Sequence, residues 1–320
     1  MLCIHLQNDD PNFCLAAEEF LLKHYSDDIF MLWQSHDTVV VGKHQNAMAE
    51  INYPFVRRHG IRVARRISGG GTVFHDRGNI NFTFLKNVAG PQEISFKRFT
   101  APIVSVLHEL GVAAETSGRN DLLVAGKKIS GNAEHVFKKR VLHHGTLLFC
   151  SDLENLGNAI RITPGKYTGK AVQSNRSPVA NISDFLSSPL TISDFMQRLF
   201  QHQLATVAGS RMYQIPADER EQIERLAREK FETPEWQFNY SPAYLFQNSA
   251  AVGEKTVSVS LEVEKGVITR AKIAGNYYPT EVQTTLQQIL PGQPHAFESL
   301  SAAHRLVGFT VPEETIYLYF

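Results

Sequence analysis

The sequence predicts an α+β fold divided into two domains. A chain of 320 residues can bury a sizeable core and is long enough for two domains. Strand-like segments that alternate apolar and polar residues are joined by short turns, as in residues 122–130 and 257–273. Helical segments with apolar stripes stand between them. We expect a large domain over residues 1–242 and a small α+β domain over residues 243–320.

The predicted elements follow from local patterns. The first helix spans residues 12–24, because Asp10-Pro11-Asn12 is a typical helix start and an apolar stripe follows, with Glu18 and Glu19 between its apolar residues. The other predicted helices span residues 53–59, 96–110, 192–207, 218–231 and 281–290. The predicted strands span residues 29–33, 38–41, 61–65, 72–74, 80–84, 122–124, 127–130, 147–150, 257–263 and 267–273.

The densest cluster of chemically informative residues is Arg65–Phe84, RRISGGGTVFHDRGNINFTF. Its glycines, Gly69–Gly71, lie between two predicted strands and cost more backbone entropy than a bare hairpin requires. Without Cβ atoms they let a ligand lie against the backbone, and successive N–H groups can bind one anion. The stretch therefore indicates an anion site to which Arg65 and Arg66 add charge, with a plain glycine loop as the alternative.

A second cluster lies in residues 117–135, SGRNDLLVAGKKISGNAEH. Two strand-like segments flank Ala125-Gly126, which predicts a hairpin. Because side chains alternate along a strand, Lys127 and Lys128 must face opposite sides, and only one of them can point inward. A buried ammonium group needs an anion such as phosphate or carboxylate. Two solvated lysines on an exposed hairpin are the alternative.

His143 and His144 are adjacent and precede the predicted strand at residues 147–150. A histidine pair can ligate a metal, but no cysteine, histidine or carboxylate stands at a familiar zinc spacing. The pair alone therefore does not predict a zinc site.

Composition argues against several classes of function. Thirty-two basic residues balance thirty-two acidic ones, so no global field attracts the chain to nucleic acid or to a membrane. The N-terminal segment lacks the pattern of a signal peptide, and no apolar run is long enough to predict a membrane span. Three unclustered cysteines fit reduced thiols better than a disulfide framework, so we expect a cytoplasmic protein.

Several segments together resemble the lipoate-protein ligase family of the biotin and lipoate ligase superfamily. They come in the family's order over most of residues 11–185, and their combination is more specific than any one of them. The segments are NFCLAAEEFLL, TVVVGKHQNAMAEIN, RRISGGGTVFHD, GNINFTF, GRNDLLVAGKKISGNA, HHGTLLF and KAVQSNRSPVANI. EWQFNYSPAY and VSLEVEKGVITRAKI resemble the C-terminal accessory domain of the family's long form. The resemblance implies mixed and antiparallel sheets packed with helices in the large domain.

The same resemblance implies a two-step acyl transfer that uses ATP and Mg²⁺. Lipoate or octanoate would react with ATP to give an acyl-adenylate and pyrophosphate. The adenylate would then acylate a lysine of a lipoyl domain, either in the E2 subunit of a 2-oxoacid dehydrogenase complex or in the glycine-cleavage H protein. Lys128 matches the family's essential lysine and would neutralise charge at the carbonyl and α-phosphate oxygens.

The remaining site residues are carried over from the family position by position. The lipoyl and adenylate site would be lined by Arg66, Ser68, Gly70, Gly71, His75 and Ser130. The adenine would be held by Asn79 and by the backbone of Thr72, Val73 and Phe74. The acyl pocket would be bordered by His144, with Leu15, Val41 and Ala133 as candidates for its apolar tunnel or, alternatively, for ordinary core.

Asn120 and Asp121 would anchor the magnesium ion, since a hard cation prefers oxygen ligands. Glu134 and His135 depart from the family, which often has an aromatic residue and an arginine there, and SNRSPV at residues 174–179 lacks one basic residue. These departures bear on acceptor preference and on closure over the adenylate, and leave the reaction type unchanged. The basic turn at residues 138–140 would contact an acidic acceptor domain or, alternatively, only solvent.

Two alternatives stay open at this point. An acyltransferase of the same fold would take octanoyl or lipoyl groups from a carrier through a cysteine thioester, but residues 114–117, where such enzymes place the nucleophile, contain no thiol. We expect Cys14 and Cys150 to pack as small hydrophobic residues. A non-catalytic binding module is the other alternative, and the joint presence of Lys128 and the glycine run argues against it. A biotin ligase is disfavoured because that branch has a GRGR-type loop where RRISGGG stands.

Overall fold

The computed structural model describes residues 1–117, 120–161 and 164–320. The chain forms two compact units. Unit 1 contains residues 1–42, 62–157 and 174–233, and unit 2 contains residues 43–61, 158–173 and 234–320. Two segments from the large predicted domain thus group with the C-terminal segment. The domain boundary between residues 242 and 243 stays a prediction.

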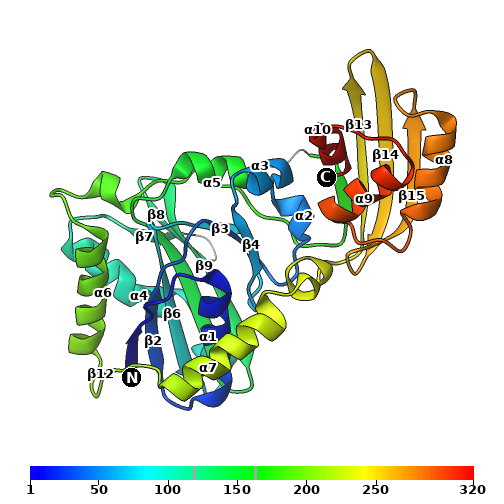
Figure 1. Cartoon of the computed structure of the whole chain (residues 1–320). Coiled ribbons are helices and arrows are strands. Elements are labelled where there is room, and N and C mark those ends of the chain that lie inside the picture. Colours follow the sequence, from blue (N-terminus) through cyan, green and yellow to red (C-terminus); the bar gives the residue numbers. More distant parts are fainter. Residues whose placement is uncertain (118–119, 162–163) are drawn as a thin grey trace. The chain divides into compact units, whose positions relative to one another are not determined.

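An eight-stranded mixed sheet forms the centre of unit 1 (Figure 1). Across the sheet, the strands are β12 (Arg211–Met212), β1 (Leu2–His5), β2 (Ile29–Trp33), β6 (Asn79–Asn87), β10 (Arg140–Leu148), β9 (Lys127–Phe137), β8 (Asp121–Val124) and β7 (Glu115–Ser117). β1 is parallel to both of its neighbours, and all pairs from β2 to β7 are antiparallel. This mixed pairing confirms the predicted fold class.

Helices cover both faces of the large sheet. α4 (Phe96–Glu109) and α6 (Ile192–Thr206) pack on one face, and α1 (Pro11–His24) packs on the other (Figure 1). The face under α4 and α6 is apolar, with Phe30, Phe82 and Phe84 in the core cluster. α7 (Ala217–Leu226) and the π-helix η3 (Ala227–Phe231) pack against α1. The shorter helices of this part of the chain are α5 (Leu153–Ala159), η1 (Pro91–Glu93) and η2 (Ile182–Phe185).

A second sheet in unit 1 positions the glycine stretch. Its central strand is β3 (Thr38–Val41), with β4 (Arg62–Arg65) parallel on one side and β5 (Val73–His75) antiparallel on the other. β4 ends and β5 begins beside the last residues of β3. The glycine loop, residues 66–72, therefore crosses the carboxyl end of β3.

Unit 2 is built on a four-stranded antiparallel sheet. Its strands are β11 (Tyr167–Gly169), β13 (Tyr244–Val252), β14 (Lys255–Glu264) and β15 (Val267–Gly275). Its helices are α2 (Ala47–Glu50), α3 (Tyr53–Arg58), η4 (Glu235–Asn239), α8 (Thr280–Ile289), α9 (Phe297–Leu306), α10 (Glu313–Ile316) and η5 (Tyr317–Tyr319). No helix in the described ranges is both long and apolar enough to cross a membrane.

Two local predictions are wrong. The strand expected at residues 147–150 is the end of β10, which begins at Arg140 and contains both histidines of the adjacent pair. Cys150 lies beyond that strand and is exposed, whereas we expected it to be buried. The full length of β10 was not predicted because its polar residues His143 and His144 are buried against Phe99 and Glu18, which are distant in sequence.

Candidate active site

Arg66 holds the glycine loop from the inside. Its Nη2 donates to the carbonyl oxygens of Gly69 at 2.6 Å and Gly71 at 2.7 Å, and its Nη1 donates to the carbonyl oxygen of Val40 at 3.1 Å. Gly70 has a φ of +86°, a conformation that favours glycine. Burial lowers the pKa of Arg66 to about 10, so the guanidinium group remains charged at neutral pH.

The loop directs N–H groups away from Arg66. In a trans peptide the carbonyl group is opposite to the N–H group of the next residue, so the N–H groups of Gly70 and Thr72 point away from the guanidinium group. The Thr72 N–H donates to Oγ of Ser174 at 2.8 Å. A Cβ on Gly71 would lie 3.2 Å from the same oxygen, so Ser174 lies directly against the loop. The loop thus has the form of an anion-binding site.

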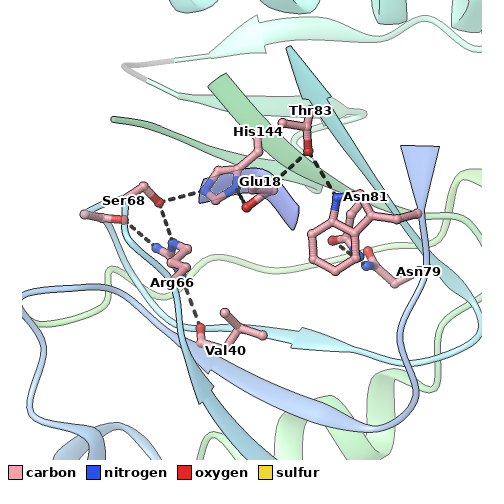
Figure 2. Close-up of polar contacts among 10 residues, drawn as sticks. Glu18, Val40, Arg66, Ser68, Asn79, Asn81, Thr83 and His144 are labelled. Atoms are coloured by element: carbon pink, nitrogen blue, oxygen red, sulfur yellow. Dashed lines mark hydrogen bonds and ion pairs between the residues drawn. The ribbon is translucent and has the colours of Figure 1, made fainter. Parts of the chain in front are cut away.

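Ser68 joins the loop to a chain of buried polar side chains (Figure 2). Its Oγ lies 2.9 Å from Nε of Arg66 and 2.6 Å from Nε2 of His144. Nδ1 of His144 lies 2.9 Å from both carboxylate oxygens of Glu18. Thr83 Oγ1 donates to Glu18 at 2.6 Å, and Nε1 of Trp33 donates to Thr83 at 3.1 Å. We call this set the buried relay; its members are Trp33, Thr83, Glu18, His144, Ser68 and Arg66.

Lys128 is the partly buried lysine of the predicted hairpin. Its Nζ lies 2.9 Å from Oδ1 of Asp121, while Lys127 is exposed. A Cβ on Gly131 would lie 2.9 Å from both Cε and Nζ of Lys128, so the ammonium group lies directly over that glycine. Of the two open alternatives for this hairpin, the structure therefore favours one partly buried lysine, and that lysine is Lys128.

The glycine loop and Lys128 meet on one face of β9. Gly131 and Ala133 are two residues apart on this strand, so their Cα substituents point to the same face. Lys128 lies over Gly131, and a Cβ on Gly70 would lie 3.7 Å from Cβ of Ala133. His144 pairs with Ala133 in the neighbouring strand and reaches the relay from this face. An anion bound to the loop would therefore lie close to a cation.

Other predicted site residues lie deeper. His75 is 3% exposed, and its Nδ1 lies 3.2 Å from Oγ of Ser35. Burial lowers the pKa of His75 to about 3, with Arg66 and His144 adding to the effect, so its ring is neutral at neutral pH. Phe74 is 2% exposed in β5. Of the expected tunnel candidates, both Leu15 at 2% and Val41 at 0% are buried.

Asn79 and Asn81 form an incompletely satisfied pair in β6. Nδ2 of Asn79 donates to Oδ1 of Asn81 at 3.1 Å, and both side chains are buried. Oδ1 of Asn79 and Nδ2 of Asn81 are left without a hydrogen-bond partner. Since such buried atoms are rare in native proteins, they indicate a place where a ligand or water supplies the missing partner. Ser130, at 1% exposure, accepts instead from Nδ2 of Asn132 at 3.3 Å.

The oxygen donors expected for magnesium lie at the start of β8, where Asp121 pairs with Gly131 of β9. Asp121 is paired with Lys128, and Nδ2 of Asn120 donates to the carbonyl oxygen of Asn132 at 2.8 Å. Asn120, Asp121 and Asn132 line a cavity of about 270 Å³ together with residues of α4. Across the described ranges, no group of three or more His, Cys, Asp or Glu side chains could hold a metal. One carboxylate and one amide fit a magnesium ion whose other ligands are phosphate oxygens and water. Gly118 and Arg119 of the quoted motif lie outside the described residues.

A family model for the lipoyl protein ligase A/B catalytic domain matches residues 10–203, a range that contains the glycine loop, the buried relay and Lys128. The chain belongs to the lipoyl protein ligase A/B family. This confirms the family that the sequence motifs indicated.

Members of the ligase family match over nearly the whole chain. Lipoate-protein ligase 1 of Staphylococcus aureus is 37% identical over 316 residues, which cover 97% of this chain and 93% of the relative. The lipoate-protein ligase LplJ of Bacillus subtilis is 37% identical over 300 residues, covering 92% and 91%. A solved bipartite lipoate protein ligase from Thermoplasma acidophilum, described together with its E2 lipoyl domain, has a TM-score of 0.65 at 25% identity. It covers 74% of this chain and 95% of its own.

For this ligase-family chain, sequence reasoning missed Glu18, Thr83 and Trp33 of the relay, and did not assign Ser174 a contact with the loop. Glu18 and Glu19 were interpreted only as polar residues between apolar ones, yet every residue of α1 from Pro11 to Leu22 is buried. Two carboxylates within such an apolar helix could have indicated a functional role for Glu18, because buried carboxylates need hydrogen-bond or charge partners.

The structure separates the two histidines of the adjacent pair and buries one residue of the basic turn. His143 lies on the opposite face of β10 from His144, where it stacks on Phe99 at 4.8 Å, so the pair cannot ligate one ion. In the basic turn, Arg140 is 9% exposed and donates to the carbonyl oxygen of Asp27 at 2.8 Å. Only Lys138 and Lys139 of that turn are exposed to a partner.

Proposed function

We propose that this chain is an ATP-dependent lipoate-protein ligase. It would activate lipoate as lipoyl-adenylate, with release of pyrophosphate, and transfer the lipoyl group to a lysine of a lipoyl domain. The observation that carries the proposal is the convergence of the glycine loop and Lys128 over Gly131 and Ala133 on one face of β9. Curated relatives with 37% identity are named lipoate-protein ligases, which supports the same reaction.

The first step joins two anions. A carboxylate oxygen of lipoate attacks the α-phosphorus of ATP, the bond from that phosphorus to the bridging oxygen breaks, and pyrophosphate leaves. Lys128 supplies a fixed positive charge, and the N–H groups of the glycine loop supply dipoles that need no reorganisation. Asp121 would hold Lys128 in place before the substrates arrive.

The second step is aminolysis of the adenylate. The uncharged amine of the acceptor lysine attacks the lipoyl carbonyl carbon, AMP leaves with the electron pair of the C–O bond, and the amine loses a proton to solvent. Lys128 would stabilise the negative charge that develops on the carbonyl oxygen. No covalent bond to the enzyme is required.

The other site residues would contact different parts of the bound ligand. Arg66, Ser68, Gly70 and Gly71 would surround the phosphate and carboxylate groups, and the backbone of Thr72, Val73 and Phe74 would run along the adenine. The Ser130 side chain faces Asn132 on the other side of β9, so it would support the strand beneath the ligand. Asn79 offers an unpartnered Oδ1 that would accept from the adenine amino group. His75, His144 and Ala133 would border the acyl chain.

Asn120 and Asp121 would hold the magnesium ion, whose chemical contribution when bound is to shield the charge of the phosphate oxygens. Their oxygen donors fit that ion, as described above. The acceptor would be a lipoyl domain of an E2 subunit or the glycine-cleavage H protein. One solved relative is described together with its E2 lipoyl domain, which supports the first of these.

The thiols give no support to a cysteine-based acyltransferase. Cys3 and Cys14 are buried, and burial raises the pKa of Cys14 well above its ordinary value. Cys150 is exposed, and partial burial of its thiol together with Asp76 raises its pKa as well. A reactive cysteine needs a lowered pKa. Free thiols are also the basis for our proposal that the protein works in the cytoplasm.

Lipoylation of an apo lipoyl domain tests the proposal. The domain is incubated with the chain, lipoate and MgATP, and its mass is measured. We expect a gain of one lipoyl group that requires ATP and is lost when all nucleotide is removed. Modification that requires an acyl-carrier donor instead of ATP would identify an acyltransferase. Absence of modification on both a lipoyl domain and the H protein, without pyrophosphate release, would identify a binding module.

A further inference from the structure

The hydrogen bonds of the buried relay can run in only one direction (Figure 2). Arginine and tryptophan side chains are donors only, and an ionised carboxylate is an acceptor only. Nε of Arg66 must therefore donate to Ser68, and Nε1 of Trp33 must donate to Thr83. Both arms of the relay end at Glu18, which accepts from Thr83 and from His144.

Glu18 fixes one proton on His144, because a carboxylate only accepts and Nδ1 must therefore donate to it. Because Oγ of Ser68 already accepts from Arg66, its own O–H group is free to donate to Nε2 of His144 at 2.6 Å. Nε2 is then an acceptor, and the ring carries its proton on Nδ1, which donates to Glu18. A single tautomer satisfies every bond of the relay, so the bonds polarise one another in the same sense.

The relay also connects two opposite charges. Glu18 is 0% exposed and Arg66 is 5% exposed, and a lone buried charge of either sign would be costly. The Ser68 and His144 side chains separate them and carry a continuous hydrogen-bond path from cation to anion. Removing the anion would leave Arg66 buried without its charge partner in this chain of bonds.

We propose that Glu18 is a positioning residue for the adenylation step. It acts through His144 and Ser68 to fix Arg66, and Arg66 fixes the carbonyl groups of Gly69 and Gly71 so that the loop is formed before ATP binds. The inference rests on the proposed function and deepens it. Glu18 lies on α1, and it acts on the loop only through other side chains.

Glu19 provides a matched control on the same helix. It is 3% exposed, is next to Glu18 in sequence, and pairs with Lys23 and Lys230 at 2.5 Å each. These two ion pairs tie α1 to its own surface lysine and to η3, and neither involves a residue of the relay. Glu19→Gln therefore removes a buried charge from α1 without touching the glycine loop.

The test separates the two half-reactions. Adenylation is measured as lipoate-dependent exchange of pyrophosphate into ATP, and transfer is measured with preformed lipoyl-adenylate and an apo lipoyl domain. We expect Glu18→Gln to lower adenylation by about 100-fold, with a raised KM for ATP, because a misplaced site typically loses this much. Transfer by Glu18→Gln and both steps in Glu19→Gln should stay within about threefold of wild type.

Several results would overturn the inference. Equal losses in both half-reactions, equal losses in the Glu18 and Glu19 variants, or full adenylation by Glu18→Gln would each contradict it. An acyl group found covalently on Ser68 would also contradict it, since that would make Glu18, His144 and Ser68 a nucleophilic triad. Wild-type protein without lipoate-dependent exchange would instead contradict the proposed function itself.

Nitrogen NMR of the wild-type protein tests the inference even if the Glu18 variant fails to fold. The ¹⁵N shifts of His144 should report a proton on Nδ1 and an unprotonated Nε2 that accepts from Ser68. A proton on Nε2 would contradict the relay, because Nε2 would then donate to Ser68 and the bonds would no longer run in one direction from Arg66 to Glu18.

Discussion

Gly131 determines where the Lys128 ammonium group can lie. A Cβ at this position would lie 2.9 Å from Cε and Nζ of Lys128, closer than real Cβ contacts occur, so Gly131→Ala must displace the lysine. We expect adenylation to fall by about 10-fold to 100-fold, because small displacements of a charge-stabilising group are costly. Pyrophosphate exchange at saturating lipoate measures the loss.

Gly157→Ala is the control for that substitution. Gly157 lies in α5, and a Cβ there would have no neighbour within 4 Å. Alanine should raise the free energy of unfolding by up to about 1 kcal/mol through helix propensity and leave the exchange rate unchanged. If both alanine variants keep full activity, Gly131 does not position Lys128.

Among single residues, the sequence drew attention to those that belong to a motif of adjacent residues. The glycine run and the lysine doublet are unusual local patterns, but by themselves they left a plain glycine loop and two solvated lysines open. The resemblance to the ligase family is what selected Lys128. Glu18 could not be assigned, since its partners Thr83 and His144 are 65 and 126 residues away in sequence. A long-range hydrogen bond leaves no pattern near the residue that makes it.

The N-cap of α1, the helix that carries Glu18, contributes to the stability of the protein. Oδ1 of Asp10 accepts from the N–H groups of Asn12 at 2.8 Å and Phe13 at 3.1 Å. Asp10→Ala should lower the free energy of unfolding by about 0.5 to 2 kcal/mol, as loss of an N-cap does. Urea denaturation followed by circular dichroism measures the change.

Asp10→Asn separates the cap from the ion pair between Asp10 and Arg62. Asparagine caps helices as well as aspartate does, and a half-exposed ion pair contributes little. We therefore expect Asp10→Asn to keep most of the stability that alanine loses. Equal destabilisation by both variants would assign the effect to the ion pair.

Elements with their own periodicity were predicted well, and elements that depend on partners were not. The bounds of β2 and β3 agree with the sequence prediction, and α1 and α6 begin within one residue of it. β1 and β12 are short strands that are supported mainly by pairing with residues distant in sequence, and β7 is a three-residue strand that pairs with the nearby β8. Short strands of this kind carry too few residues for a pattern.

At the scale of the molecule, buried histidines make stability depend on pH. His295 lies in unit 2, where Nδ1 bonds Oη of Tyr244 at 2.7 Å and Nε2 bonds the carbonyl oxygen of Tyr319 at 2.6 Å. Burial lowers the pKa of His295 to about 4, against about 6.5 when unfolded. Between these values the unfolded state binds a proton that the folded state does not, so stability falls as pH falls.

His295→Gln removes this contribution. The variant should be less stable than wild type at pH 7, and the gap should narrow by up to about 1.4 kcal/mol per pH unit from pH 6.5 towards 4.5. Thermal unfolding across that range measures the difference. A gap that stays constant with pH would show that His295 does not titrate differently on folding.

The sequence did not predict which segments form unit 2. Residues 43–61 and 158–173 join the C-terminal segment because of long-range contacts within that unit. Tyr53 stacks on Phe320 at 4.1 Å, and Arg57 pairs with Glu298 at 2.8 Å. Local sequence predicts the secondary structure of a segment, whereas long-range contacts such as these decide which of the two units the segment belongs to.

The central claim is that Lys128, placed beside the glycine loop, makes the chain an ATP-dependent lipoate ligase. Lipoate-dependent exchange of pyrophosphate into ATP tests it most directly, with wild type, Lys128→Ala and the exposed neighbour Lys127→Ala compared side by side. We predict exchange in wild type, a loss of about 100-fold to 1000-fold in Lys128→Ala, and little change in Lys127→Ala. Wild-type exchange that survives in Lys128→Ala, or falls equally in both variants, would contradict the account.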